Sequence, residues 1–172
     1  MAADGGEPPT RIMVAVNESS KVGYPRPSIS CMEAFEWVLN KIIRSKSNAS
    51  GFTILLLHVQ APEKGIDDSD SIYASAADIK SPKHKEVLLG LEFLEYFQKQ
   101  CRDIGLACEA WVKRGDPRKL ICSEVKRVQP DLLVVGCSRR GLSFYQKILI
   151  KSVSGHCRKN ADCPVAVIKS SV

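Results

Sequence analysis

Short apolar runs alternate with segments of helical spacing along this 172-residue chain, and this alternation restricts the possible folds strongly. The apolar runs are Arg11–Val16, Phe52–Val59, Leu106–Val112, Leu132–Val135 and Val165–Ile168. Because most are near-continuous rather than alternating, they predict strands buried on both faces. Strands joined through helices form a parallel sheet with right-handed crossovers. The sequence therefore predicts an α/β three-layer sandwich with a five-stranded, mostly parallel sheet.

The first two helices are predicted from caps and apolar spacing. Ser28 or Ser30 is expected to cap the first helix. Its buried face is expected to hold Cys31, Phe35, Val38 and Ile42. Ser81-Pro82 opens the second helix and Gly105 ends it. Its buried stripe is expected to hold Val87, Leu91, Leu94, Phe97, Cys101 and Ile104.

Two further helices follow the third and fourth strands. Asp116 as N-cap and Pro117 at the first helical position begin one of them, and Gln129-Pro130 ends it. The other is expected from about Ser152 to Lys159. Since ligands of such sheets lie beyond the carboxyl ends of the strands, the loops after the first, second and fourth strands are expected to form the site.

Length and composition are those of an ordinary globular chain, and we expect one domain over residues 10–170 after a disordered tail over 1–9. No apolar stretch is long enough to span a bilayer, and the N-terminus lacks the basic and apolar regions of a secretory signal. The seven cysteines are odd in number and form no C-x-x-C pair, which favours a reducing compartment. We expect a cytoplasmic protein without a membrane partner.

Two features that suggest metal binding or catalysis have simpler explanations. Residues 61–80 hold several aspartates, but their spacing lacks the glycine and distal glutamate of a calcium loop, so a solvated acidic loop is expected. His58 lies near the end of a buried strand, where a hydrogen-bonded structural role is expected. The sequence predicts no metal ligand and no catalytic residue.

The segment 131–154 combines a buried strand, a glycine, a basic loop and a helix start at Ser152-Val153-Ser154. No acidic residue occurs between Gly136 and Asn160, whereas six Lys or Arg residues do. Loop amides and a helix N-terminus form a ready site for phosphate. An ordinary crossover with a solvated basic loop is the competing interpretation.

The same segment resembles the C-terminal nucleotide-binding motif of the universal stress protein family, particularly its small single-domain plant members. Gly141, the nine residues 142–150 and Ser152-Val153-Ser154 match the second half of that motif. The ending 160–165 is also similar, and the resemblance extends from Arg11 to Lys169. It implies a Rossmann-like, adenine nucleotide alpha hydrolase-like fold and a stress-response protein that binds ATP or AMP, with or without Mg²⁺.

The resemblance also implies a role for each site residue. Ala15 and Val59 correspond to adenine contacts, and Asn17 stands where the family has a ribose-binding Asp. Val16, which directly precedes Asn17 at the end of the first predicted strand, is also placed at the site. Phosphate and sugar contacts are implied for Val135, Gly136, Arg140, Gly141, Ser152, Val153 and Ser154. Lys151 is also placed at the site, where its side chain either blocks the phosphate or brings its ammonium group to it. Binding and signalling through ligand-dependent conformation or dimerisation is the implied mode of action, with slow nucleotide hydrolysis as a lesser alternative.

Two departures from the motif keep alternatives open. Four residues separate Gly136 from Gly141 where the family has two, and Lys151 replaces the third glycine. A member that has lost the nucleotide and acts as a dimeric interaction module is therefore one alternative. The apolar strand Val165–Ile168 suits pairing across a twofold axis in a homodimer. A basic nucleic-acid-associated protein is a weaker alternative, because few aromatic residues accompany the basic ones.

Overall fold

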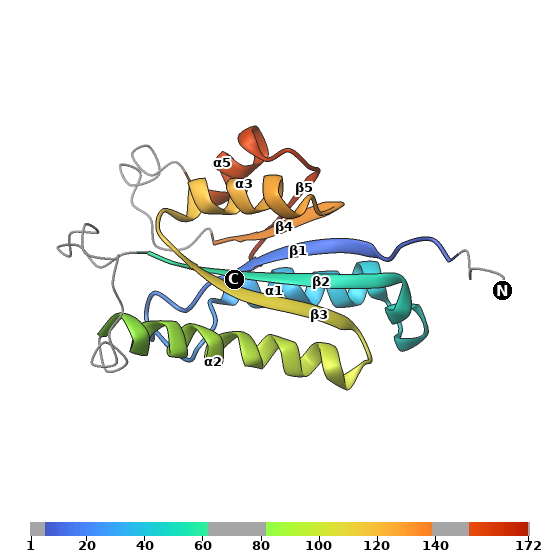
Figure 1. Ribbon diagram of the computed structural model, residues 1–172, viewed down its shortest axis with the longest axis horizontal. Helices are drawn as coiled ribbons and strands as arrows, with labels where there is room; N and C mark the ends of the chain where they lie inside the picture. The colour runs from blue at the N-terminus through green and yellow to red at the C-terminus, as the bar shows by residue number, and fades with distance from the viewer. Residues whose placement is uncertain (1–5, 62–81, 139–151, 172) are drawn as a thin grey trace.

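The computed structural model describes residues 6–61, 82–138 and 152–171 (Figure 1). Its strands form one sheet in the order β3-β2-β1-β4-β5, and every neighbouring pair is parallel. The strands are β1 Thr10–Val16, β2 Phe52–Gln60, β3 Ala107–Arg114, β4 Leu132–Cys137 and β5 Val165–Lys169. The predicted five-stranded parallel sheet is therefore confirmed, with strand ends shifted by at most two residues. The predicted acidic loop and the basic loop 139–151 fall outside the described residues.

Helices cover both faces of the sheet, which gives the three predicted layers (Figure 1). On one face lie α1 (Ile29–Trp37), which continues as the π-helical turn η1 (Val38–Ile43), and α2 (Pro82–Asp103). On the other lie α3 (Pro117–Val128) and α5 (Val153–Asn160). The short 3-10 helix η2 (Lys46–Gly51) leads into β2.

The core consists of two apolar layers, one on each side of the sheet. Alternate strand residues such as Ile12 and Ile54 face α1 and α2, and Met13 and Leu55 face α3 and α5. All four are essentially inaccessible to solvent. This two-sided burial explains why the strands are continuous apolar runs.

The π-helical turn corrects one prediction for the first helix. Cys31, Phe35 and Val38 are buried as expected, but Ile43 is buried where Ile42 was predicted. A π-turn adds a residue to one turn, which moves the buried face one position along the chain. Ile42 is consequently only partly buried at the edge of the core.

Two residues of the predicted stripe on α2 are exposed instead of buried. Val87 is 38% exposed and Leu91 is 47% exposed. The helix contacts the sheet through Gly90, where a Cβ atom would lie 2.8 Å from Gln60 Nε2 and 3.1 Å from Val112 Cγ2. Because the glycine lies at the contact, the apolar residues on either side of it turn away. Further along, α2 buries Phe93, Leu94, Phe97 and Cys101.

The predicted helix starts are found where expected. Ser28 Oγ accepts a hydrogen bond from Cys31 N at 3.2 Å, and an Asp116 carboxylate oxygen accepts from Arg118 N at 3.0 Å. Ser152 caps α5 by accepting from Gly155 N at 3.1 Å. Within the described ranges, no helix is long and apolar enough to cross a membrane.

Candidate functional site

A pocket of about 310 Å³ opens at the carboxyl edge of the sheet, where β1, β2 and β4 end. The strand order reverses between β1 and β4. The chain adds β2 and β3 on one side of β1, and then returns to place β4 and β5 on the other side. In open parallel sheets this reversal is where ligands bind. The volume lies at the lower end of the range for small-molecule sites.

Every predicted site residue that the structure describes lines this one pocket. They come from three strand ends and a helix start that are far apart in sequence, namely Ala15, Val16, Asn17, Val59, Val135, Gly136, Ser152, Val153 and Ser154. Arg140, Gly141 and Lys151 were also predicted for the site, and they lie outside the described residues.

The prediction missed six further lining residues, which are Ser30, Leu57, Pro117, Ile121, Cys137 and Ser138. Leu57 shares a strand face with Val59, so alternation along β2 could have identified it. Pro117 and Ile121 come from the helix after β3, whose start also lies at the carboxyl edge. Ser30 carries no sequence signal, because its place depends on how α1 packs against β4.

Hydroxyl groups at the start of α5 form the polar wall of the pocket. Ser152 caps the helix, and the Ser154 hydroxyl donates to Ser152 Oγ at 3.3 Å. Ser154 is almost fully buried. The free N–H groups of the first helical turn and the helix dipole favour an anion at this end of the pocket.

Gly136 lies where β4 and α1 come into close contact. A Cβ atom there would sit 2.2 Å from the Ser30 carbonyl oxygen and 2.9 Å from Cys31 N. Backbone atoms cannot yield as a flexible side chain can. Packing against α1 is therefore sufficient to require glycine at 136, in addition to any contact with a ligand.

Asn17 connects the end of β1 to the start of α1. Its backbone carbonyl accepts from Ser28 N at 2.9 Å, and its Oδ1 accepts from the Ser28 hydroxyl at 3.1 Å. Its Nδ2 donates to Glu18 O at 3.1 Å. The carboxamide thus holds the pocket rim in place, while its exposed edge remains accessible to a ligand hydroxyl.

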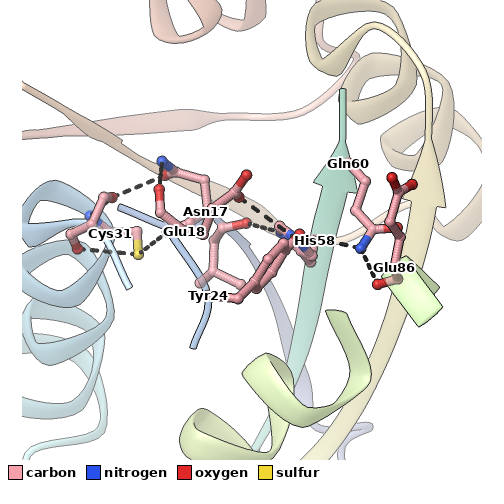
Figure 2. A network of polar contacts seen from close by, with 9 residues as sticks. Asn17, Glu18, Tyr24, Cys31, His58, Gln60 and Glu86 are labelled. Carbon is pink, nitrogen blue, oxygen red and sulfur yellow. Dashed lines mark hydrogen bonds and ion pairs between the residues drawn. The ribbon is translucent and has the colours of Figure 1, made fainter. Parts of the chain in front are cut away.

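A polar network joins the end of β1 to β2, and Gln60 Nε2 extends it to α2 by donating to the Glu86 carbonyl at 2.6 Å (Figure 2). His58 is fully buried, and its Nδ1 donates to the carbonyl of Val16 at 3.0 Å. The Tyr24 hydroxyl then donates to His58 Nε2 at 2.5 Å and accepts from Gln60 Nε2 at 3.1 Å. The predicted hydrogen-bonded role of His58 is confirmed.

Burial lowers the pKa of His58, and its hydrogen bond to the Val16 carbonyl and the nearby carboxylate of Glu18 offset part of this effect. The ring is therefore neutral at neutral pH, with its proton on Nδ1 facing Val16. Val16 also lines the pocket. The hydrogen bond from the neutral histidine therefore holds the backbone of a lining residue in place.

The chemistry of the described lining is that of a binding site for a flat apolar group joined to an anion. One wall is aliphatic, formed by Ala15, Val59, Ile121 and Val135, and the other carries hydroxyls and helix N–H groups. No Asp, Glu, Lys, Arg or His is found among the described lining residues.

Comparison with known proteins gives a family and close relatives. The model of the universal stress protein family matches residues 9–169. A universal stress protein A-like protein of Arabidopsis thaliana is 54% identical over 165 residues, which are 95% of this chain and 92% of the relative.

Two solved structures show the same fold. A universal stress protein family protein from Arabidopsis thaliana, crystallised with AMP bound, has a TM-score of 0.72 and 50% sequence identity, covering 95% of this chain and 94% of its own. A universal stress protein in complex with cAMP has a TM-score of 0.60 at 17% identity, covering 94% and 98% of the two chains. At that identity the second likeness concerns the fold alone.

Proposed function

This chain belongs to the universal stress protein family, and from that membership we propose that it binds an adenine nucleotide in the pocket at the carboxyl edge of its sheet. The observation that carries the proposal is the convergence of Ala15, Val59, Val135 and the Ser152–Ser154 segment on one pocket. The 50% identical Arabidopsis protein with bound AMP supports the choice of ligand.

The pocket suggests how the nucleotide lies. The adenine ring packs against Ala15 and Val59, and the ribose reaches the rim at Asn17. The phosphate lies at the start of α5, where the Ser152 hydroxyl and the backbone N–H groups of Val153 and Ser154 donate to it, while the Ser154 hydroxyl donates to Ser152 Oγ. Arg140, Gly141 and Lys151 are proposed to complete the phosphate contacts.

The proposed role is that of a cytoplasmic stress-response module whose conformation or assembly depends on the bound nucleotide. AMP is the primary candidate, and ATP, with or without Mg²⁺, is the second. Two alternatives predict different behaviour: an interaction protein that has lost the ligand, and a basic protein associated with nucleic acid.

We also propose a homodimer formed through β5. This strand lies at the edge of the sheet, with β4 as its neighbour in the described residues, and its side chains are only partly buried. An apolar edge strand can pair with its own copy across a twofold axis.

The nucleotide proposal is tested by isothermal titration calorimetry with AMP and ATP, each with and without Mg²⁺, on protein checked for co-purified nucleotide. Saturable micromolar binding is expected. The Ser152→Ala variant should weaken AMP binding by about tenfold or more, because a hydrogen bond to a charged phosphate is lost.

Asp116→Ala is the matched control for that variant. Both substitutions remove an N-cap and cost about 1 kcal/mol of stability, but Asp116 does not line the pocket. Equal weakening by both variants would contradict the proposed phosphate site. No binding to the wild type would favour the interaction protein, and salt-sensitive RNA binding that AMP does not displace would favour the nucleic-acid alternative.

A further inference from the structure

The segment that joins β1 to α1 begins at the rim of the pocket. Residues 17–28 form this segment, which we call the β1–α1 loop. Its two ends are held together, because Ser28 N donates to Asn17 O at 2.9 Å and Glu18 forms an antiparallel bridge with Pro27. Asn17 lines the pocket. The position of the β1–α1 loop therefore sets the position of this part of the rim.

One side chain of the β1–α1 loop fastens it to the sheet. The Tyr24 hydroxyl donates to His58 Nε2 at 2.5 Å and accepts from Gln60 Nε2 at 3.1 Å (Figure 2). His58 donates from Nδ1 to the carbonyl of Val16 at 3.0 Å. An amide nitrogen can only donate and a carbonyl can only accept, so with a neutral imidazole every donor in this chain of bonds has an acceptor. The tether at Tyr24 therefore depends on an unprotonated Nε2.

A second partner for Nε2 lies on the same loop. The Glu18 carboxylate is 3.8 Å from His58 Nε2, which is too far for a hydrogen bond, and its side chain is 33% exposed. A neutral ring offers Nε2 only as an acceptor, and a carboxylate cannot donate to it. A protonated ring donates from Nε2, and a carboxylate then binds it more strongly than a hydroxyl does. His58 Nε2 thus has one partner when neutral and another when charged.

The other groups packed around His58 do not compete for its proton. From α2, the Phe93 ring lies against the imidazole, with ring centroids 4.7 Å apart. The Glu86 carboxylate of α2 is already paired with Arg114 of β3 at 2.9 Å. Among the described residues, Glu18 is the charged group that acts on His58.

We propose that proton uptake by His58 regulates nucleotide binding, by exchanging the hydrogen bond from Tyr24 for an ion pair with Glu18. In the neutral state, Tyr24 holds the β1–α1 loop and Asn17 lies in place at the rim. When His58 takes a proton from solvent, the Tyr24 hydroxyl loses its acceptor and Glu18, the neighbour of Asn17, moves toward the ring. The rim then shifts and the nucleotide binds more weakly. This inference rests on the proposed function, because the regulated site is the nucleotide pocket.

The direction of the pH effect follows from linkage. Because burial lowers the pKa of His58 below its ordinary value, the ring is neutral at neutral pH and takes up a proton only in mild acid. If the nucleotide prefers the neutral form, its affinity falls with pH by up to about tenfold per pH unit below that pKa. Coupling of this kind is reciprocal, so bound AMP should lower the pKa of His58 in turn.

The first test is calorimetric titration of the full chain with AMP from about pH 7.5 to about pH 5.5, the range in which histidine titrates. Its key variant is Glu18→Gln, which removes the charge at a residue outside the pocket lining and keeps the backbone carbonyl that accepts from Asn17 Nδ2. Glu36→Gln, which changes an exposed carboxylate on α1, is the matched control.

The affinity of the wild type and of Glu36→Gln should fall by about threefold to tenfold over this range. Glu18→Gln should bind as the wild type does at neutral pH and lose clearly less affinity in acid, because protonated His58 then lacks an anionic partner. A phosphate monoester itself takes up a proton near about pH 6. This contribution is the same for all the proteins, so the difference between their profiles reports His58.

The second test needs no nucleotide. Nitrogen NMR of the imidazoles follows the protonation of Nε2, and the signal of His58 is identified by its absence from the spectrum of His58→Asn. The midpoint should lie at lower pH in Glu18→Gln than in Glu36→Gln, and saturating AMP should lower the midpoint of the wild type.

The outcomes separate the two proposals. Equal NMR midpoints for Glu18→Gln and Glu36→Gln would overturn the exchange of partners, whether or not the protein binds AMP. AMP affinities that fall equally in the wild type and in Glu18→Gln would overturn the regulation and leave the proposed function standing. A wild type that does not bind AMP at neutral pH would overturn the proposed function, and the regulation with it.

Discussion

At the residue scale, Gly136 is constrained by a neighbouring backbone rather than by its own conformation. The Gly136→Ala substitution places a methyl group 2.2 Å from the Ser30 carbonyl oxygen. Either α1 or β4 must shift, so we expect the free energy of unfolding to fall by about 1–3 kcal/mol. Urea denaturation measures this loss directly.

Gly51→Ala is the matched control for that substitution. A Cβ atom at Gly51 meets nothing within 4 Å, and the substitution reduces the freedom of the unfolded chain. Its stability should equal or slightly exceed that of the wild type. If Gly136→Ala proved as stable as Gly51→Ala, the result would contradict the close contact between β4 and α1 at Gly136.

His58 is expected to make stability depend on pH between about 7 and 5. Because burial lowers its pKa in the folded protein below that of the unfolded chain, the unfolded state binds the proton first as the pH falls. The free energy of unfolding should therefore decrease below about pH 6.5, by at most about 1.4 kcal/mol per pH unit. The ionisable groups that face His58 are Glu18 and Tyr24.

The measurement is a series of urea denaturations at several pH values for the wild type and for His58→Asn. The asparagine amide nitrogen takes the position of His58 Nδ1 and can still donate a hydrogen bond to Val16 O, but asparagine does not titrate in this range. The variant should be less stable at neutral pH and should show a flatter pH dependence between 7 and 5. Equal slopes for the two proteins would assign the pH dependence to another group.

At the element scale, the π-helical turn η1 determines which isoleucine enters the core. Ile43 is 1% exposed, whereas Ile42 is only partly buried. We expect Ile43→Ala to cost about 2–5 kcal/mol and Ile42→Ala to cost clearly less, because only the first leaves a cavity. Thermal unfolding of both variants compares them, and the reverse order would mean that the helix continues in α-helical phase.

The helix features that were predicted correctly depend on residues close together in the sequence, and those that were predicted wrongly depend on residues far apart. Asp116 was predicted as a cap, and Ser28 as one of two candidates, because a cap is a contact between residues two or three positions apart. The π-turn and the orientation of α2 depend instead on packing against the sheet. A pattern of apolar residues at helical spacing does not include Gly90, although α2 contacts the sheet at that residue.

At the scale of the whole molecule, the position of the pocket followed from topology. The rule that ligands bind at the carboxyl edge identified the ends of β1, β2 and β4 before their contacts were known. Ser30 and Pro117 were missed because they join the pocket from the starts of helices that pack beside it. Such placements depend on the angles between layers, which residue spacing does not encode.

The backbone of β5 allows a specific test of the proposed dimer. Leu133 N donates to Pro164 O, and Ser170 N donates to Cys137 O, so the even-numbered residues of β5 bond to β4. Alternation then directs the N–H groups of Val165, Val167 and Lys169 away from the sheet.

Val167→Pro removes one outward N–H group and leaves the hydrogen bonds to β4 intact, which is how proline is tolerated in edge strands. The variant should remain folded but become monomeric if β5 pairs with its copy. Sedimentation velocity measures the assembly, and circular dichroism confirms the fold. Val167→Thr, which keeps the N–H group and the branched shape, should stay dimeric. A folded Val167→Pro dimer would place the twofold contact on another surface.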